Sequence, residues 1–121
     1  IVNSYDNIIR YTDFFLNSVI ETLKLNDQKY DTMMIYLSDH GESLGEKGIY
    51  LHAMPYWIAP KVQKHIPFIL WSGKWREDKI KALQKKDTMP VSHDHLFHTM
   101  LGVFDIQTKE YIQGLDLFNL K

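Results

Sequence analysis

The segment TMMIYLSDHG, residues 32–41, joins a short apolar run to an adjacent aspartate and histidine. The run has no glycine or proline before its end, which is typical of a β-strand that is buried on both faces. Three glycines follow within the next ten positions, so we expect the chain to leave this strand in a loop. The sequence therefore predicts a strand over 32–38, with Asp39 and His40 directly beyond its carboxyl end.

Further elements are predicted on both sides of this segment. Apolar residues recur at helical spacing over 4–24, and the run IPFILW over 66–71 indicates a second buried strand. A short charged helix is predicted over 75–86 and another helix over 91–106. The buried stripe expected for the last helix is Leu96, Phe97, Met100, Leu101 and Phe104.

The order helix, strand, loop, strand, helix predicts an α/β fold. Two core strands make a small sheet, so we expect part of a sheet flanked by helices, incomplete in this chain. Its 121 residues correspond to about one domain. The chain begins at Ile1 without a methionine, and we interpret it as a piece of a longer protein.

The composition excludes several classes of protein. Fourteen basic and fifteen acidic residues give a net charge of -1, so nucleic acid is not an expected partner. There is no cysteine, which excludes disulfides and thiolate metal sites. No apolar run reaches the ~18 residues that a membrane helix needs.

The Asp39–His40 pair has two interpretations. Ligands of open α/β sheets bind beyond the carboxyl ends of strands, and a carboxylate with an imidazole suits a zinc-type ion. Further ligands are then required, because zinc is usually four-coordinate. Alternatively, Asp39 caps a turn and His40 is a hydrogen-bonded loop histidine.

The remaining polar residues are weaker candidates by pattern alone. We interpret Glu42 and Glu46 as solvated loop carboxylates, and spacing does not by itself assign His52 to a site. A cap and surface cluster is the expected role of three histidines near the start of the last predicted helix: His93, His95 and His98. For His93 the alternative is a position facing the same crevice as Asp39 and His40.

Four blocks resemble the C-terminal part of the lipid A phosphoethanolamine transferases. This group includes the mobile enzymes of colistin (polymyxin) resistance and belongs to the alkaline phosphatase and sulfatase superfamily. The blocks occur in the expected order within residues 1–106: YDNIIRYTDFFLNSVIETLK, YLSDHGESLGEKGIYLHAMPYWIAP, QKHIPFILW and SHDHLFHTMLGVFD. The second block is long and specific. Ala53 departs from the pattern, since many members have glycine after the histidine.

The resemblance implies an inner-membrane protein with a soluble periplasmic catalytic domain, built on an alkaline-phosphatase-like sheet flanked by helices. A zinc ion would be held by Asp39 and His40 together with a glutamate and a threonine from upstream segments. That threonine would be the nucleophile, taking phosphoethanolamine from phosphatidylethanolamine to lipid A or another envelope acceptor. His52 would be catalytic and substrate-binding, contacting the substrate phosphate or a second metal position.

Parts that the resemblance implies are not recognisable in the sequence. No threonine has the surroundings of the nucleophile, and neither the upstream glutamate ligand nor the membrane helices are in view. We therefore expect residues 1–121 to be a C-terminal fragment of the periplasmic catalytic domain, inactive alone and weak in zinc binding. Exposed strand edges and apolar surface should make it self-associate.

The sequence is also compatible with two alternatives. A sulfatase or phosphoglycerol transferase of the same superfamily would share the Asp-His pair, and the upstream nucleophile would separate them. A non-catalytic interaction module is the alternative from another class, since 13% of the residues are aromatic. Its binding surface would use the tryptophans Trp57, Trp71 and Trp75.

Overall fold

A computed structural model describes residues 1–85 and 88–119. The chain divides into two compact units, Ile1–Trp75 and Arg76–Lys121. Helices and strands are mixed in the order that the sequence predicts, which confirms the α/β class. Among the described residues, no helix combines the length and the apolar character that crossing a membrane requires.

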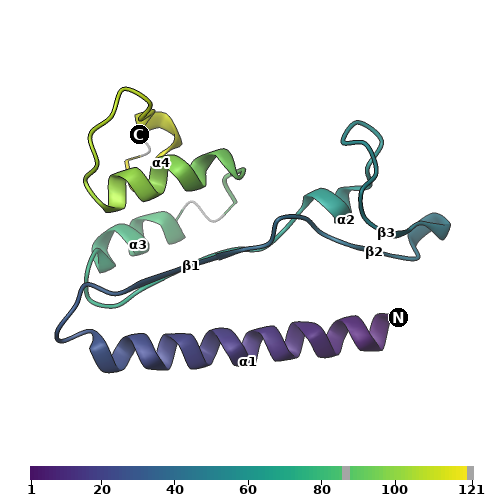
Figure 1. Cartoon of the computed structure of the whole chain (residues 1–121), viewed down its shortest axis with the longest axis horizontal. Helices are drawn as coiled ribbons and strands as arrows, with labels where there is room; N and C mark the ends of the chain where they lie inside the picture. Colours follow the sequence, from purple (N-terminus) through teal and green to yellow (C-terminus); the bar gives the residue numbers. More distant parts are fainter. Residues whose placement is uncertain (86–87, 120–121) are drawn as a thin grey trace. The chain divides into compact units, whose positions relative to one another are not determined.

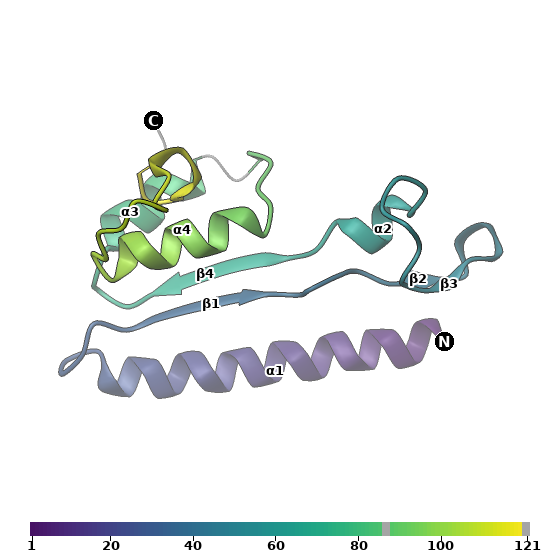
Figure 2. The same cartoon turned by 45° about the horizontal axis from the view of Figure 1, so that its top comes forward.

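The first unit begins with the long helix α1 (Val2–Asn26). This helix lies alongside the strand β1 (Met33–Leu37) in both views (Figures 1 and 2). No residue of α1 is fully buried, and Leu16, Val19 and Leu23 are among those that are partly covered. A second group of apolar residues stays exposed, including Tyr11 (70%) and Phe14 (67%). The predicted helix is confirmed, but only part of its apolar surface finds a partner.

The central sheet of this unit has two antiparallel strands. β1 pairs with β4 (Phe68–Ser72) in a register that sets Met33 opposite Ser72 and Leu37 opposite Phe68. The expectation that both strands are buried on both faces was wrong, because on the two strands only Met34 is buried, at 8% exposure. A ladder of two strands has an open edge on each side, so its residues remain partly accessible.

A small hairpin follows β1 where the sequence predicts only a loop. It consists of β2 (Ser43–Leu44), the 3-10 turn η1 (Glu46–Gly48) and β3 (Tyr50–Leu51). The strands are antiparallel, with Ser43 opposite Leu51. The short helix α2 (Lys61–Lys64) then leads the chain back to β4.

The second unit contains α3 (Glu77–Gln84), α4 (Asp94–Val103) and the 3-10 turn η2 (Gln113–Leu115). The end of the predicted helix 75–86, at Lys86, lies outside the described residues. The buried residues of α4 are His98, Thr99 and Val103, whereas Phe97 and Phe104 are exposed at 54% and 63%.

The stripe expected for α4 was therefore wrong at its two aromatic residues. The reason is that the segment after α4 selects a different face of the helix. The Ile112 backbone N–H donates to His98 Nδ1 at 3.1 Å, and the Leu117 N–H donates to Thr99 Oγ1 at 3.1 Å. These polar contacts bring Leu117 and Phe118 into the core, at 5% and 8% exposure.

A buried carboxylate fixes the end of this unit. Asp116 is 0% exposed and accepts hydrogen bonds from the Tyr111 hydroxyl at 2.7 Å and from the Asn119 amide at 2.6 Å. The Phe118 N–H donates to its other oxygen at 2.9 Å. The hydrogen bond to Asp116 is the main cause that raises the pKa of Tyr111. The network satisfies a group that would otherwise be costly to bury.

Candidate functional site

Asp39 and His40 lie in the turn that directly follows β1, as predicted. The Ser38 hydroxyl donates to the His40 carbonyl at 2.7 Å, and the His40 backbone N–H donates to Asp39 Oδ1 at 3.1 Å. The other carboxylate oxygen, Oδ2, lies 3.8 Å from His40 Nε2. Asp39 therefore caps the turn with one oxygen and turns the second toward the imidazole.

The hydrogen bonds of His40 decide which ring nitrogen is available. Its Nδ1 lies 2.8 Å from the Gly41 carbonyl, which can only accept, so this nitrogen carries the proton. The Nε2 atom is then left with its lone pair on the side of Asp39. A histidine whose other N–H is bound by a backbone carbonyl is the usual arrangement of a metal ligand.

Asp39 is held in its charged form. The side chain is 88% exposed, and hydrogen bonding from its own backbone N–H, followed by the electrostatic effect of the nearby His40 ring, lowers the pKa of the carboxyl group. An ionised carboxylate oxygen and an imidazole nitrogen, both within reach of one ion, are donors that suit zinc. The two residues fit such an ion, although they supply only two protein ligands.

His52 joins this region through the hairpin. It follows β3 directly, and its ring stacks on that of His40 with centroids 3.8 Å apart and planes tilted by 31°. Glu42 precedes β2, and its Oε2 atom lies 3.1 Å from His52 Nδ1. Donor atoms of His40, Glu42 and His52 all lie within 4.8 Å of one another.

Glu42 is the residue that sequence reasoning missed. Its side chain is only 24% exposed, and its Oε1 atom is buried without a hydrogen-bond partner. The interpretation as a solvated loop carboxylate was wrong, because the hairpin turns Glu42 toward His52. The two-residue strands gave no periodic signal from which this could be predicted. Glu46 is exposed as expected, and its carboxylate accepts from the Leu44 N–H at 2.9 Å.

The backbone on both sides of His52 adopts a conformation that L-residues seldom take. Leu51 has φ of 65° and Ala53 has φ of 74°. Such left-handed residues cost about 1–2 kcal/mol each and are common next to functional side chains. The geometry at Ala53 also gives a physical reason for the glycine that many members of the resembled family have at this position.

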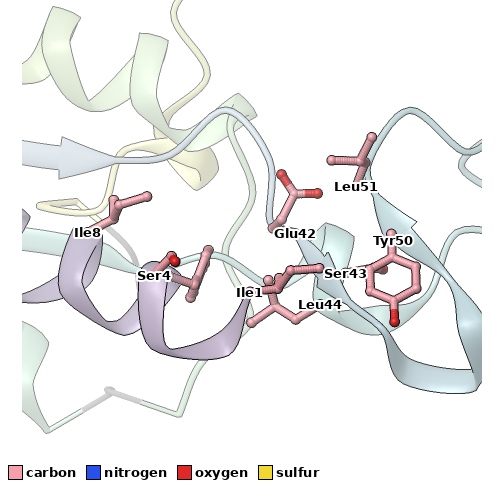
Figure 3. A pocket seen from close by; sticks show the side chains of 9 residues that line it. Ile1, Ser4, Ile8, Glu42, Ser43, Leu44, Tyr50 and Leu51 are labelled. Atoms are coloured by element: carbon pink, nitrogen blue, oxygen red, sulfur yellow. The ribbon is translucent and has the colours of Figure 1, made fainter.

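An apolar cavity of about 470 Å³ lies beside this cluster, between the start of α1 and the hairpin (Figure 3). Figure 3 shows Ile8 and Ser4 on the α1 side and Leu44 and Tyr50 on the hairpin side. Glu42 is among the residues that line the cavity. An apolar hollow thus adjoins the cluster at Glu42.

The other histidines singled out from the sequence belong to the second unit. His98 is buried at 8% exposure, so its assignment to a surface cluster was wrong, whereas His93 is exposed. The Ser92 N–H donates to His95 Nδ1 at 3.1 Å, which is consistent with a role at the start of α4. Trp57 is 82% exposed, while Trp71 lies on β4 and is partly covered.

The order of elements and the donor set define an α/β protein with a potential metal site at the end of a strand. The model of the sulfatase family matches residues 1–106. The chain therefore belongs to the sulfatase family.

Within this family, the chain is similar to phosphoethanolamine transferases. Over 122 residues the chain is 45% identical to "Phosphoethanolamine transferase EptA" of Salmonella typhimurium, covering 97% of this chain and 22% of that protein. It also matches the crystal structure of the C-terminal periplasmic domain of phosphoethanolamine transferase EptC from Campylobacter jejuni, with a TM-score of 0.91 and 46% identity. That match covers 98% of this chain and 38% of the solved one.

A third similarity is to an integral membrane protein, lipooligosaccharide phosphoethanolamine transferase A from Neisseria meningitidis. The TM-score is 0.88 with 41% identity, and the match covers 97% of this chain and 23% of that structure. The chain thus spans about a fifth of the length of the full-length proteins it matches. The similarity to phosphoethanolamine transferases, predicted from the four sequence blocks, is confirmed.

Proposed function

We propose that this chain forms part of a zinc-dependent transferase that moves phosphoethanolamine from phosphatidylethanolamine to lipid A or another envelope acceptor. The observation that carries the proposal is the approach of Asp39 Oδ2 to His40 Nε2, at 3.8 Å, next to the ring of His52. The names of the three similar proteins support the transferred group, and that of the Neisseria protein supports a lipid-linked acceptor.

In this proposal Asp39 and His40 are the metal ligands of the chain. A bound zinc ion would supply positive charge near the phosphoryl oxygens and favour ionisation of a nucleophilic hydroxyl. The Gly41 carbonyl holds the His40 ring, and the turn after β1 holds the Asp39 carboxylate. The nucleophile is a threonine outside these 121 residues, as are the remaining ligands.

His52 is proposed to contact the substrate phosphate. Because a carboxylate only accepts hydrogen bonds, the Nδ1 atom facing Glu42 carries a proton. The Nε2 atom is then free of that bond and can exchange a proton with a phosphate oxygen. The side chains of Glu42 and His40 together orient the ring for this contact.

The proposed location is the bacterial inner membrane, with this part of the protein on the periplasmic side. The Campylobacter structure is described as a periplasmic domain and the Neisseria protein as an integral membrane protein, which supports the proposal. Membrane attachment would come from a region outside the chain.

The experiment uses the full-length protein in membranes with labelled phosphatidylethanolamine and purified lipid A. Asp39→Ala and His40→Ala are each expected to abolish transfer while the fold survives, because Asp39 and His40 are not core residues. Asp31→Asn, an exposed carboxylate at the other end of β1, is the matched control and should retain activity. Full transfer by either alanine variant would refute the proposal.

Sulfate ester hydrolysis is the second candidate, favoured by the family model itself. The same membranes should be assayed with an aryl sulfate. Release of sulfate without transfer of phosphoethanolamine would favour this candidate. A non-catalytic module would tolerate both alanine substitutions without loss of function, which the same variants test.

A further inference from the structure

A buried glutamine on α2 contacts a sequence neighbour of each of the three clustered side chains. Gln63 is 6% exposed, the one buried residue of its helix. Its side-chain amide donates to Ser43 Oγ at 2.8 Å and to the Leu51 carbonyl at 3.0 Å. The backbone carbonyl of Gln63 accepts from the Gly41 N–H at 3.0 Å. Because the Leu51 carbonyl can only accept, the nitrogen of the amide must face the hairpin.

The partners of Gln63 are the sequence neighbours of the cluster. Gly41 follows His40, Ser43 follows Glu42, and Leu51 precedes His52. A single residue thus binds one position away from each of the three donors. Ser43 and Leu51 are also opposite each other in the β2–β3 pairing, so the amide bridges both strands at the same rung.

The hairpin needs contacts from outside its own strands to be stable. Each of its strands has two residues, and so short a ladder is marginal without further contacts. The left-handed backbone at Leu51 and Ala53 adds strain, which persists only where surrounding contacts over-determine it. Ser43 is 2% exposed, so its bond to Gln63 is shielded from competing water.

We propose that Gln63 is a positioning residue. Its buried amide connects β2 to β3 through hydrogen bonds and so keeps the Glu42–His52 pair next to His40. Gln63 does not reach the donor atoms itself and acts through their neighbours. The consequence for phosphoryl transfer rests on the proposed function, but the positioning itself does not. The test therefore measures the geometry of His52 directly in the metal-free protein and needs no transferase activity.

The measurement is long-range ¹H–¹⁵N NMR of the imidazoles at about pH 8, above the ordinary titration range of histidine. In the unsubstituted protein His52 should show one tautomer, with the proton on Nδ1 facing Glu42, and a nuclear Overhauser effect to His40. Gln63→Met keeps the length of the side chain and removes both donors. It is expected to replace the single tautomer with a mixture and to abolish the His40–His52 contact.

Thr32→Val is the matched control. Thr32 is also buried in the first unit, at 5% exposure, and its hydroxyl donates to Asp27 Oδ1 at 2.7 Å, remote from the hairpin in the chain. The variant loses a buried hydrogen bond, so its urea midpoint should fall as that of Gln63→Met does. The His52 tautomer should stay unchanged. A change of tautomer in both variants would indicate a general loss of structure and overturn the assignment.

A folded Gln63→Met protein with the Nδ1 tautomer and the His40 contact intact would also refute the proposal. If circular dichroism shows that this variant does not fold, Ser43→Ala decides instead, since it removes one of the two acceptors and leaves the other. A measurable fraction of the second tautomer is then expected. An unaltered His52 spectrum in the folded Ser43→Ala protein would overturn the proposal.

Discussion

Replacing Gly41 by alanine tests how the turn after β1 is packed against α2. A Cβ atom at this position would lie 1.9 Å from the Val62 carbonyl oxygen, and ordinary contact begins at 3.4 Å, so one backbone must move by about 1.5 Å. Neither side of this contact is a flexible side chain. The shift would break the Gly41 N–H to Gln63 carbonyl bond of 3.0 Å and displace His40.

The expected cost has two parts. Loss of the backbone hydrogen bond contributes about 1 kcal/mol, and the overpacked contact about 1–3 kcal/mol. Gly41→Ala should therefore lower the free energy of unfolding by about 2–4 kcal/mol. Gly48→Ala is the control, because a Cβ there meets nothing within 4 Å and only its φ of 76° opposes the substitution. That strain is about 1–2 kcal/mol, and the entropy change of the unfolded chain is common to both variants.

Urea unfolding followed by tryptophan fluorescence is a suitable assay, because all three tryptophans lie in the first unit. With a slope of about 1–3 kcal/mol per molar urea, Gly41→Ala should move the midpoint down by about 0.7 M or more. A Gly41→Ala midpoint equal to that of the unsubstituted protein, or no lower than that of Gly48→Ala, would refute this account of the turn.

Four further expectations follow from particular contacts. Hydrogen bonds, mainly the one from the Thr32 hydroxyl, lower the pKa of Asp27. The stability that ionised Asp27 gives the folded chain is therefore present above the aspartate pKa of the unfolded chain, and it is lost as pH falls through the pKa of the folded state. Asp27→Asn should thus flatten the acid limb of a stability-against-pH curve. Tyr111→Phe removes a donor to buried Asp116 and should destabilise the second unit by about 1–3 kcal/mol, measured by thermal unfolding. Ala53→Gly should stabilise by up to about 1 kcal/mol, because glycine relieves a φ of 74°, and a lower urea midpoint would contradict this. Sedimentation should show self-association, and Phe14→Glu on exposed α1 surface should reduce it.

The elements with long or uninterrupted patterns could be predicted from the sequence. The periodicity of residues 4–24 located α1, and the apolar runs located β1 and β4 within two residues of their ends. These signals are local, because each depends on side chains within one element. Burial could not be predicted in the same way, since it depends on which faces find partners. Phe97 and Phe104 illustrate this, because the segment after α4 selects another face of the helix.

The candidate site was predictable only in part. Asp39 and His40 follow from the end of an apolar strand, and His52 was named only through the resemblance. Glu42 and Gln63 carried no signal, because their roles depend on a hairpin of two-residue strands and on a bond between residues 20 positions apart in the chain. A buried polar residue on a four-residue helix is visible only once the fold is known.

The proposed metal site is tested most directly by X-ray absorption at the zinc edge, combined with anomalous scattering, on the zinc-loaded full-length protein. If Asp39 and His40 are the metal ligands, an ion should lie about 2.0–2.2 Å from a carboxylate oxygen of Asp39 and from Nε2 of His40. An ion bound elsewhere, with Asp39 and His40 bonded only to the backbone of their own turn, would contradict this assignment.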